Sequence, residues 1–330
     1  MTTQSTGRAM GRTLLAAVLL AAGLSGTVMA QGAFPSKQIR FIVPYAAGGY
    51  PDTVARIIGQ HMQERIGQSV VVENRPGGNG GVAATVLSQS GADGYTLMVT
   101  DGSIMSANPL LISKLTYDPD KDFAPVALLT SAPLFLAVHP AVPVTSFQGF
   151  LDHVRANPGK VNYGSSSVGS THHLAMEAIK AAYGLNIVHI PYRGTGQSVP
   201  ALVGGQVEVL FSAYPSLIGF VKDNRVRLIA SNGATRSPLT PDLPTIGEFI
   251  PGFDFAPLVG ILAPAGTPKA VVDKIAAEAL VALKTPEATR QLQNAGIEPV
   301  GKGPEDYAAA IKAENARYVD VVRKAGIKPE

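Results

Sequence analysis

The chain has 330 residues, of which 46% are apolar and 15% are charged, and its formal net charge is +3 at pH 7. This composition excludes a disordered chain, and the absence of cysteine excludes disulfides, thiolate metal sites and cysteine nucleophiles. A net charge so close to zero argues against nucleic-acid binding by phosphate neutralisation, and about 300 residues is enough for two domains of ordinary size.

The first 30 residues are typical of a cleaved secretory signal peptide. Arg8 and Arg12 form a charged region, residues 14–22 are an apolar run, and Ala30 ends a small-residue cleavage motif. The apolar run is shorter than the ~20 residues that span a bilayer. We therefore expect export to the periplasm, with cleavage after Ala30 and residues 1–30 removed.

The mature chain alternates short apolar strands with helices, which predicts an α/β fold with doubly wound, parallel sheets. The first series has strands at 39–44, 69–73 and 95–100 and helices at 51–66 and 82–89. A second series follows Pro133, with strands at 134–138, 161–165, 187–190, 207–211 and 227–230 and helices at 147–157 and 171–183. The last third is predicted to be mostly helical, with helices at 269–283, 286–295 and 304–325.

The domain organisation follows from two expected crossovers of the chain, near residues 130–133 and 231–234. We predict that residues 31–132 and 232–330 form one discontinuous lobe and that residues 133–231 form the second. The last helix then packs back on the first lobe.

Three corners where a strand leads into a helix are candidate binding sites. They are residues 45–52, residues 165–171 and, as a weaker candidate, residues 192–198. A helix N-terminus presents unpaired N–H groups and a partial positive charge, which suit a carboxylate or a phosphate. Each corner alone is also explained as an ordinary turn, but three of them in an exported, two-lobed chain indicate an anion-binding cleft.

Other motifs point less clearly to chemistry. Gly78, Gly80 and Ala83 match a dinucleotide fingerprint, but residues 74–77 separate them from the preceding strand, and an exported protein has little access to NAD. His173 and Glu177 share a helix face and could contribute to a metal site, yet a hydrogen-bonded structural pair is the simpler interpretation. We expect no catalytic residue, no cofactor and no metal.

Six phrases of the sequence resemble the Bug/TctC family, the periplasmic solute-binding receptors of tripartite tricarboxylate transporters. They are IRFIVPYAAGGYPDTVAR (39–56), VVVENRPGGNGG (70–81), DGYTLM (93–98), YDPDKDFAPV (117–126), NPGKVNYGSSS (157–167) and ILAPAGTP (261–268). The resemblance covers essentially the whole mature chain. It implies a type II periplasmic-binding-protein fold, in which two α/β lobes are joined by a two-segment hinge and a ligand cleft lies between them.

The resemblance also implies a set of ligand-binding residues. The family holds a ligand carboxylate with backbone groups and ordered waters, between the corner after the first strand and loops of the second lobe. Carried over to this sequence, the site consists of Tyr45, Ala47, Gly48, Gly49, Asp52, Thr100, Asp101, Ser103, Ser165, Ser166, Gly169, Ser170, Thr171, His173, Gly194, Thr195, Ser198, Ser212, Ala213 and Pro215.

The function implied by the resemblance is that of a receptor without enzyme activity. It captures a small organic carboxylate and delivers it to the membrane subunits of a tripartite tricarboxylate transporter; we expect a monomer that binds no nucleic acid. A sensor that reports ligand to a kinase would use the same fold and cleft. A periplasmic hydrolase using Ser166 or Ser170 with His173 is a further alternative, but no third catalytic member is evident.

The class of carboxylate depends on Asp101. Relatives often carry Asp and Asn where this chain has Ser212 and Ala213, and tryptophan is absent, so ligand identity cannot be transferred. If Asp101 faces the cleft, we expect a monocarboxylate or an amino-bearing acid, because a second carboxylate would meet a like charge. If it points away, a C4–C6 di- or tricarboxylate, the usual ligand of the family, is expected.

Overall fold

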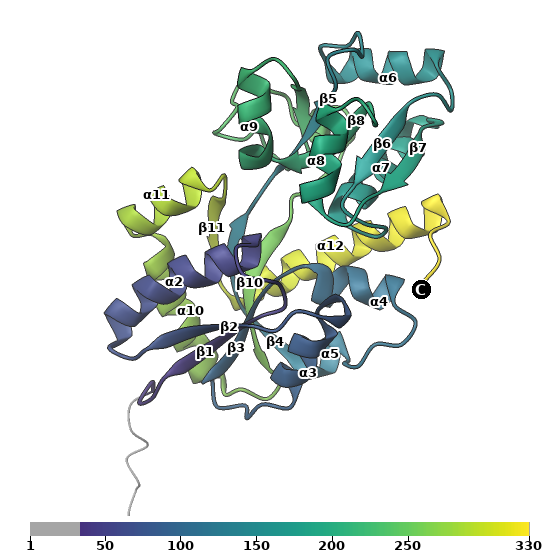
Figure 1. The fold of residues 1–330 in the computed structure, drawn as a ribbon. Coiled ribbons are helices and arrows are strands. Elements are labelled where there is room, and N and C mark those ends of the chain that lie inside the picture. The colour runs from purple at the N-terminus through teal and green to yellow at the C-terminus, as the bar shows by residue number, and fades with distance from the viewer. Residues whose placement is uncertain (1–33, 330) are drawn as a thin grey trace, which may run out of the picture. The chain divides into compact units, whose positions relative to one another are not determined.

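The computed structural model describes residues 34–329, so the predicted signal peptide lies outside the described residues. From Lys37 onward the chain forms one unit that contains two β-sheets with helices packed against them (Figure 1).

The first sheet contains strands from both ends of the described chain. Its six strands have the order β11-β4-β10-β3-β1-β2. They are β1 (Ile39–Val43), β2 (Val70–Asn74), β3 (Thr96–Asp101), β4 (Phe123–Ser131), β10 (Leu258–Pro264) and β11 (Glu298–Lys302). β1 pairs in parallel with β2 and β3, whereas β10 is antiparallel to β3 and β4, and β11 is antiparallel to β4.

The second sheet has five strands in the order β7-β6-β8-β5-β9. They are β5 (Leu134–Val138), β6 (Asn162–Ser165), β7 (Val188–Pro191), β8 (Val209–Ala213) and β9 (Arg227–Ser231). β6 is parallel to β7 and β8, but β5 is antiparallel to β8 and β9. The predicted parallel pairing is present in both sheets, but each sheet is mixed. β5 runs antiparallel to β8 and β9, and β10 runs antiparallel to β3 and β4.

The helices lie between and around these strands. They are α2 (Tyr50–Ile66), α3 (Gly81–Ser88), α4 (Asn108–Leu111), α5 (Pro119–Asp122), α6 (Phe147–Ala156), α7 (Thr171–Tyr183), α8 (Thr195–Val203), α9 (Tyr214–Lys222), α10 (Lys269–Leu283), α11 (Pro286–Asn294) and α12 (Pro304–Ala325). Short non-α turns lie at Gly78–Gly80, Ser103–Ala107 and Ile246–Glu248. The predicted bounds of α7, α10 and α12 are confirmed, and strands β4, β10 and β11 are absent from the sequence prediction.

Two segments of the chain cross between the sheets. β4 ends at Ser131 and β5 begins at Leu134, while β9 ends at Ser231 and the chain returns to β10 at Leu258. The fully buried Asn232 joins the two crossings. Its Oδ1 accepts from the Leu134 N–H at 2.7 Å, and its Nδ2 donates to the Phe255 carbonyl at 2.7 Å. The predicted lobe limits remain a prediction, and these paired crossings are where a hinge would lie.

The C-terminal helix α12 contacts both halves of this unit. Tyr307, near its start, belongs to the apolar core beneath the first sheet. Tyr318 and Val321, near its end, belong to the core of the second sheet, and α12 packs against α7. The last helix therefore bridges the two cores, whereas the sequence predicts that it packs on the first lobe.

Candidate functional site

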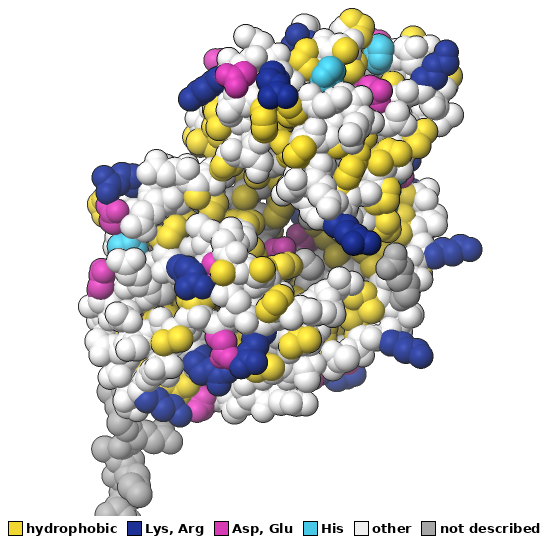
Figure 2. All heavy atoms as spheres, viewed as in Figure 1, with side chains coloured by type: hydrophobic (Ala, Val, Ile, Leu, Met, Phe, Trp, Pro, Cys, Tyr) yellow, Lys and Arg dark blue, Asp and Glu magenta, His cyan; other side chains and the backbone are white. Residues whose placement is uncertain are grey.

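A cavity of about 840 Å³ lies between the two sheets, within the range of small-molecule sites. Figure 2 shows it as a hollow near the middle of the molecule, with acidic and apolar side chains around it. The N-terminal residues of four helices line it: α2 with Gly49 and Tyr50, α7 with Ser170 and Thr171, α8 with Thr195, and α9 with Pro215 and Ser216. Helix N-termini carry partial positive charge, so their convergence on one cavity suits an anion.

Most of the residues proposed from the sequence line this cavity. They are Tyr45, Gly48, Gly49, Asp101, Ser103, Ser166, Gly169, Ser170, Thr171, Gly194, Thr195, Ala213 and Pro215. The others do not line it: Ala47 is exposed, and Asp52, Thr100, Ser165, His173, Ser198 and Ser212 are buried. The residues that line the cavity remain proposed ligand contacts, and the buried ones have supporting roles where the structure shows their partners.

Asp52 is buried beneath the first corner, residues 45–52, and its hydrogen bonds hold the corner in place. Its side chain is 2% exposed and accepts hydrogen bonds from the Gly48 N–H (2.8 Å), Arg56 Nε (3.0 Å) and Asn74 Nδ2 (2.8 Å). Burial alone would raise the pKa of Asp52, but these hydrogen bonds outweigh it and lower that pKa. Because Asp52 occupies the Gly48 N–H, that backbone group is not available to a ligand.

Asp101 lines the cavity at the end of β3 and is held in place by its neighbours. Its Oδ1 accepts from the Tyr45 hydroxyl (2.7 Å), from the Ser103 N–H (3.0 Å) and from the Ser103 hydroxyl. Burial is the main cause that raises the pKa of Tyr45, and the nearby charge of Asp101 raises it further. The Tyr45 hydroxyl therefore remains protonated and can donate. Within the described residues all side-chain hydrogen bonds to Asp101 use Oδ1, which leaves Oδ2 for a ligand.

The serine-rich corner leads into α7 and is held by His173. Ser170 is the N-cap: its hydroxyl accepts from the His173 N–H at 3.3 Å, as serine does at helix starts. The ring Nδ1 of His173 accepts from the Gly169 N–H at 3.0 Å, which places the ring proton on Nε2. His173 therefore shapes the loop that lines the cavity without lining it.

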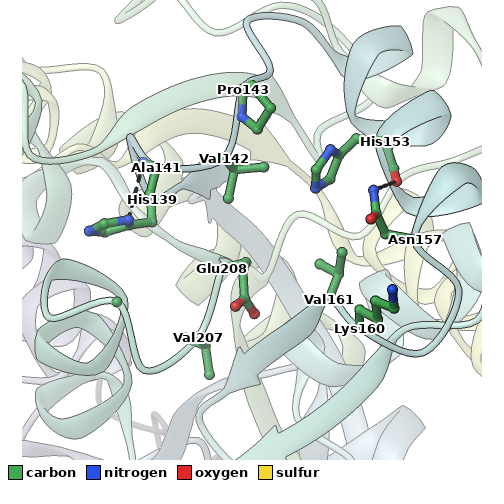
Figure 3. A pocket seen from close by; sticks show the side chains of 11 residues that line it. His139, Ala141, Val142, Pro143, His153, Asn157, Lys160, Val161, Val207 and Glu208 are labelled. Atoms are coloured by element: carbon green, nitrogen blue, oxygen red, sulfur yellow. Dashed lines mark hydrogen bonds between the residues drawn. The ribbon is translucent and has the colours of Figure 1, made fainter.

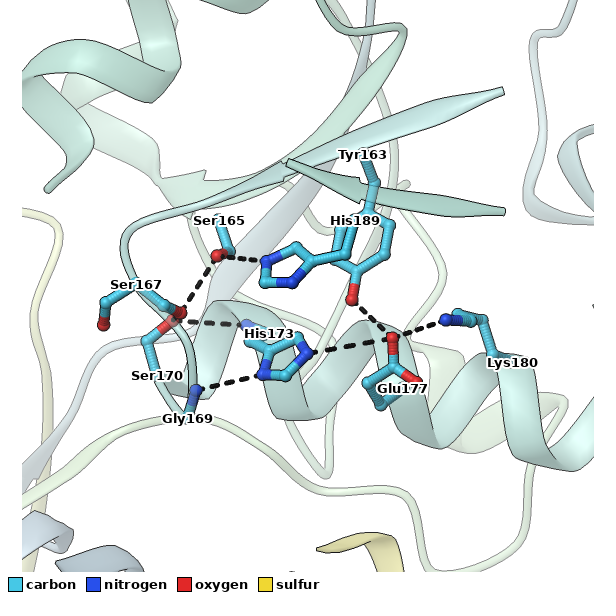
Figure 4. A network of polar contacts seen from close by, with 9 residues as sticks. All are labelled: Tyr163, Ser165, Ser167, Gly169, Ser170, His173, Glu177, Lys180 and His189. Carbon is cyan, nitrogen blue, oxygen red and sulfur yellow. Dashed lines mark hydrogen bonds and ion pairs between the residues drawn. The ribbon is translucent and has the colours of Figure 1, made fainter. Parts of the chain in front are cut away.

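A stack of rings supports this corner, as Figure 4 shows. The imidazoles of His173 and His189 are 4.1 Å apart and nearly parallel, and the Tyr163 ring stacks on His189 at 4.7 Å. The Tyr163 hydroxyl (2.5 Å) and Lys180 Nζ (2.6 Å) both donate to Glu177 Oε1. Ser165 Oγ lies 2.6 Å from His189 Nε2. Ser165, His173 and Glu177 thus belong to one structural network.

The serines of this corner are not arranged as the hydrolase alternative requires. Ser166 Oγ lies 2.9 Å from Nδ1 of His172, not of His173, and the Ser170 hydroxyl donates to the Ser167 carbonyl. Burial lowers the pKa of His172 to about 4, which makes it a weak base at neutral pH. Its buried Nε2 has no hydrogen-bond partner in the described structure, so no acid orients the ring.

Several cavity residues were not proposed from the sequence, and Glu314 is the most unusual of them. The others include Tyr50, Asn79, Asn108, His172, Tyr318 and Lys328. Glu314 is 3% exposed, and it lies on α12 between Tyr307 and Tyr318, at the spacing of the buried face. An acidic residue on an otherwise apolar helical stripe is a sequence signal that could have identified it.

A second, smaller cavity of about 300 Å³ lies beside the second sheet, as Figure 3 shows. Three of its polar side chains, those of His139, Glu208 and Asn157, are bonded to the surrounding backbone. His139 Nδ1 accepts from the Ala141 N–H at 3.2 Å, Glu208 Oε2 accepts from the Asn162 N–H at 2.7 Å, and Asn157 Nδ2 donates to the His153 carbonyl at 2.9 Å. We therefore place the candidate site in the larger cavity.

Within residues 34–329, no three His, Asp or Glu side chains are grouped as they would need to be to hold a metal ion. None of the helices in that range is long and apolar enough to cross a membrane.

Comparison with known proteins identifies the family. The family model described as "Tripartite tricarboxylate transporter family receptor" matches residues 54–327. The protein BugT of Bordetella pertussis is 31% identical over 93% of this chain and 94% of its own length. The chain therefore belongs to this family of solute-binding receptors, which confirms the resemblance seen in the sequence.

Two solved relatives share the fold. The structure titled "R. palustris Rpa4515 with adipate" has a TM-score of 0.78 and 34% identity and covers 90% of this chain and 100% of its own. MatC from Rhodopseudomonas palustris, with bound malate, has a TM-score of 0.72 and 32% identity and covers 88% and 100%. These matches confirm the two-lobed α/β architecture of periplasmic binding proteins.

Proposed function

We propose that the protein is a periplasmic receptor that captures a small organic carboxylate in the cavity between the two sheets and delivers it to the membrane subunits of a tripartite tricarboxylate transporter. The observation that carries this proposal is the convergence of four helix N-termini on one cavity of about 840 Å³. N–H groups at these positions can bind a carboxylate without a lysine or arginine partner. The adipate and malate bound by two relatives are ligands of this chemistry.

The role is binding, with no bond made or broken. Ser166 and His172 are in contact, but His172 is a weak base, and no acid among residues 34–329 orients its ring, so a serine nucleophile would not be activated. What the cavity offers is a set of positioned donors: the N-terminal ends of α2, α7, α8 and α9, with the hydroxyls of Ser166 and Thr171 beside them.

The test has two steps. Native mass spectrometry of protein purified from the periplasm should show a bound small acid, and its mass should guide a panel of di-, tri-, mono- and amino-carboxylates in a thermal-shift screen. At least one carboxylate should raise Tm in a concentration-dependent manner. If no member of the panel binds to the folded protein, the receptor proposal fails.

Delivery to a transporter and delivery to a sensor kinase use the same cavity. Genes for membrane transporter subunits beside the gene for this protein would favour transport, and a neighbouring kinase gene would favour sensing. Loss of uptake of the identified ligand when this gene is deleted is the direct test of the transport role.

A further inference from the structure

The cavity proposed as the ligand site has acidic groups on its own wall, and the following inference rests on that proposed function. Asp101 and Glu314 both line the cavity, while Lys328 is the only lysine or arginine among its described lining residues. Lys328 is exposed near the end of the chain, whereas Glu314 is 3% exposed. The helix N-termini of the cavity therefore favour an anion, whereas the wall that carries Asp101 and Glu314 repels one.

The packing of Glu314 places its carboxylate next to Asp101. A Cβ atom added to Gly102 would overlap both carboxylate oxygens of Glu314, so this carboxylate lies against the backbone directly after Asp101. The Tyr318 hydroxyl donates to Glu314 Oε1 at 3.4 Å. A side chain at position 102 would therefore displace the Glu314 carboxylate, although the backbone conformation of Gly102 is an ordinary one.

We propose that Glu314 is a specificity-determining residue of the cavity. Together with Asp101 it favours a ligand that carries an ammonium or hydroxyl donor at the end opposite its carboxylate. A second ligand carboxylate is accepted there only when Glu314 is protonated, because the protonated acid then donates an O–H to it, whereas two ionised carboxylates repel each other in a poorly solvated site.

The charged and titratable groups around Glu314 are consistent with this role. They are Asp101 at the end of β3 and Tyr307, Arg317 and Tyr318 on α12. Burial is the main cause that raises the pKa of Glu314 to about 7; Asp101 acts in the same direction, and Ser106, Arg317 and Tyr318 oppose it. Arg317 is shared with Asp254, whose Oδ2 is 3.9 Å from it. Glu314 can therefore change its charge near neutral pH.

The first experiment uses the wild-type protein and two matched pairs of ligands: adipate with 5-aminopentanoate, and succinate with 3-aminopropanoate. In each pair an ammonium replaces one carboxylate on a similar chain. Calorimetry at about pH 8.5 should show the amino acid of the better-fitting pair binding at least about tenfold more tightly, and this preference should shrink at least about fivefold at about pH 5.5. Near pH 7, dicarboxylate binding should take up a proton, measured as a dependence of the heat on buffer ionisation enthalpy.

The second experiment uses Glu314→Gln, which removes the charge but keeps the shape. The dicarboxylate should bind about tenfold more tightly to this variant than to wild type at about pH 8.5, and its pH dependence should disappear. Glu305→Gln, the same change at an exposed position of the same helix, should behave as wild type. If Glu314→Gln does not fold, the measurement of proton uptake by the wild type near pH 7 still tests the role of Glu314.

The outcomes separate the two proposals. A dicarboxylate that binds the wild type as tightly as its amino partner at about pH 8.5, without proton uptake near neutrality, overturns the role of Glu314 and leaves the receptor function intact. Absence of binding by both pairs and by every other carboxylate of the thermal-shift panel overturns both.

Discussion

Two neighbouring glycines at the first corner have different physical roles. Gly48 has φ of +86°, a left-handed conformation that costs other residues about 1–2 kcal/mol. Gly49 has φ of −73° and ψ of 168°, an extended conformation that any residue adopts. A Cβ on Gly49 would lie 3.5 Å from the Ala46 carbonyl, an ordinary contact. A side chain introduced at Gly49 would therefore occupy space in the cavity without straining the backbone.

We predict that Gly49→Val weakens binding of the carboxylate identified by the thermal-shift screen by at least about tenfold, or about 1.4 kcal/mol, because valine fills space that the ligand needs. Calorimetric titration measures this change. Gly303→Val is the matched control, since Gly303 is also an extended helix N-cap, with φ of −74°, and does not line the cavity. Wild-type affinity in Gly49→Val would move the ligand away from this corner.

The packing of α7 against β6 and β7 depends on uncharged histidines. Burial lowers the pKa of His173, and burial together with His173 lowers the pKa of His189 to about 4. The folded protein therefore binds protons at these rings less readily than the unfolded chain does. The stabilisation that these neutral rings provide is fully present above the ordinary histidine pKa of about 6.5. It is lost as the pH falls towards the lowered pKa values of the folded protein.

We predict that His189→Gln reduces the acid sensitivity of the protein. Between about pH 7 and about pH 4, the free energy of unfolding of the wild type should fall by about 2 kcal/mol more than that of the variant, because glutamine does not take up a proton. Urea unfolding at both pH values measures the difference. His153→Gln on α6, outside the ring stack, is the control and should follow the wild type. Equal pH dependence in wild type and His189→Gln would contradict this interpretation.

Taken together, the paired crossings between the sheets suggest a hinge. Asn232 holds the two crossings together, and the proposed cavity lies between the sheets that they connect. A hinge of this kind gains contacts on closing only when a ligand fills the cavity, so the ligand shifts the population towards the closed state.

We therefore predict that a saturating carboxylate ligand decreases the radius of gyration of the mature protein, measured by small-angle X-ray scattering. Gly49→Val at a ligand concentration too low to occupy it should keep the radius of the ligand-free protein. A radius that does not change when the wild type is saturated would rule out ligand-driven closure.

The local features of this chain were predictable because they depend on residues close in the sequence. Helical spacing and end signals are sufficient for α7, α10 and α12, whose bounds match the prediction. Strand β10 was not predictable in this way, because a short buried apolar run has the same pattern in a strand and in a buried helix. Its place between β3 and β4 depends on residues more than 100 positions earlier.

The candidate site also has features that were predictable from short segments and features that depend on the packing of distant ones. Family motifs located the glycine and serine corners, because a strand that leads into a helix N-terminus is a local pattern that carries its own donors. Alternation along a strand does not predict which way its last side chain points. Only the folded structure shows that Asp101 lines the cavity, where Tyr45 and Ser103 hold it. Glu314 joins it from α12, more than 200 residues away in sequence, because that helix packs across both cores. Donor corners are thus properties of short segments, whereas the charge balance of the cavity arises only when distant segments pack together.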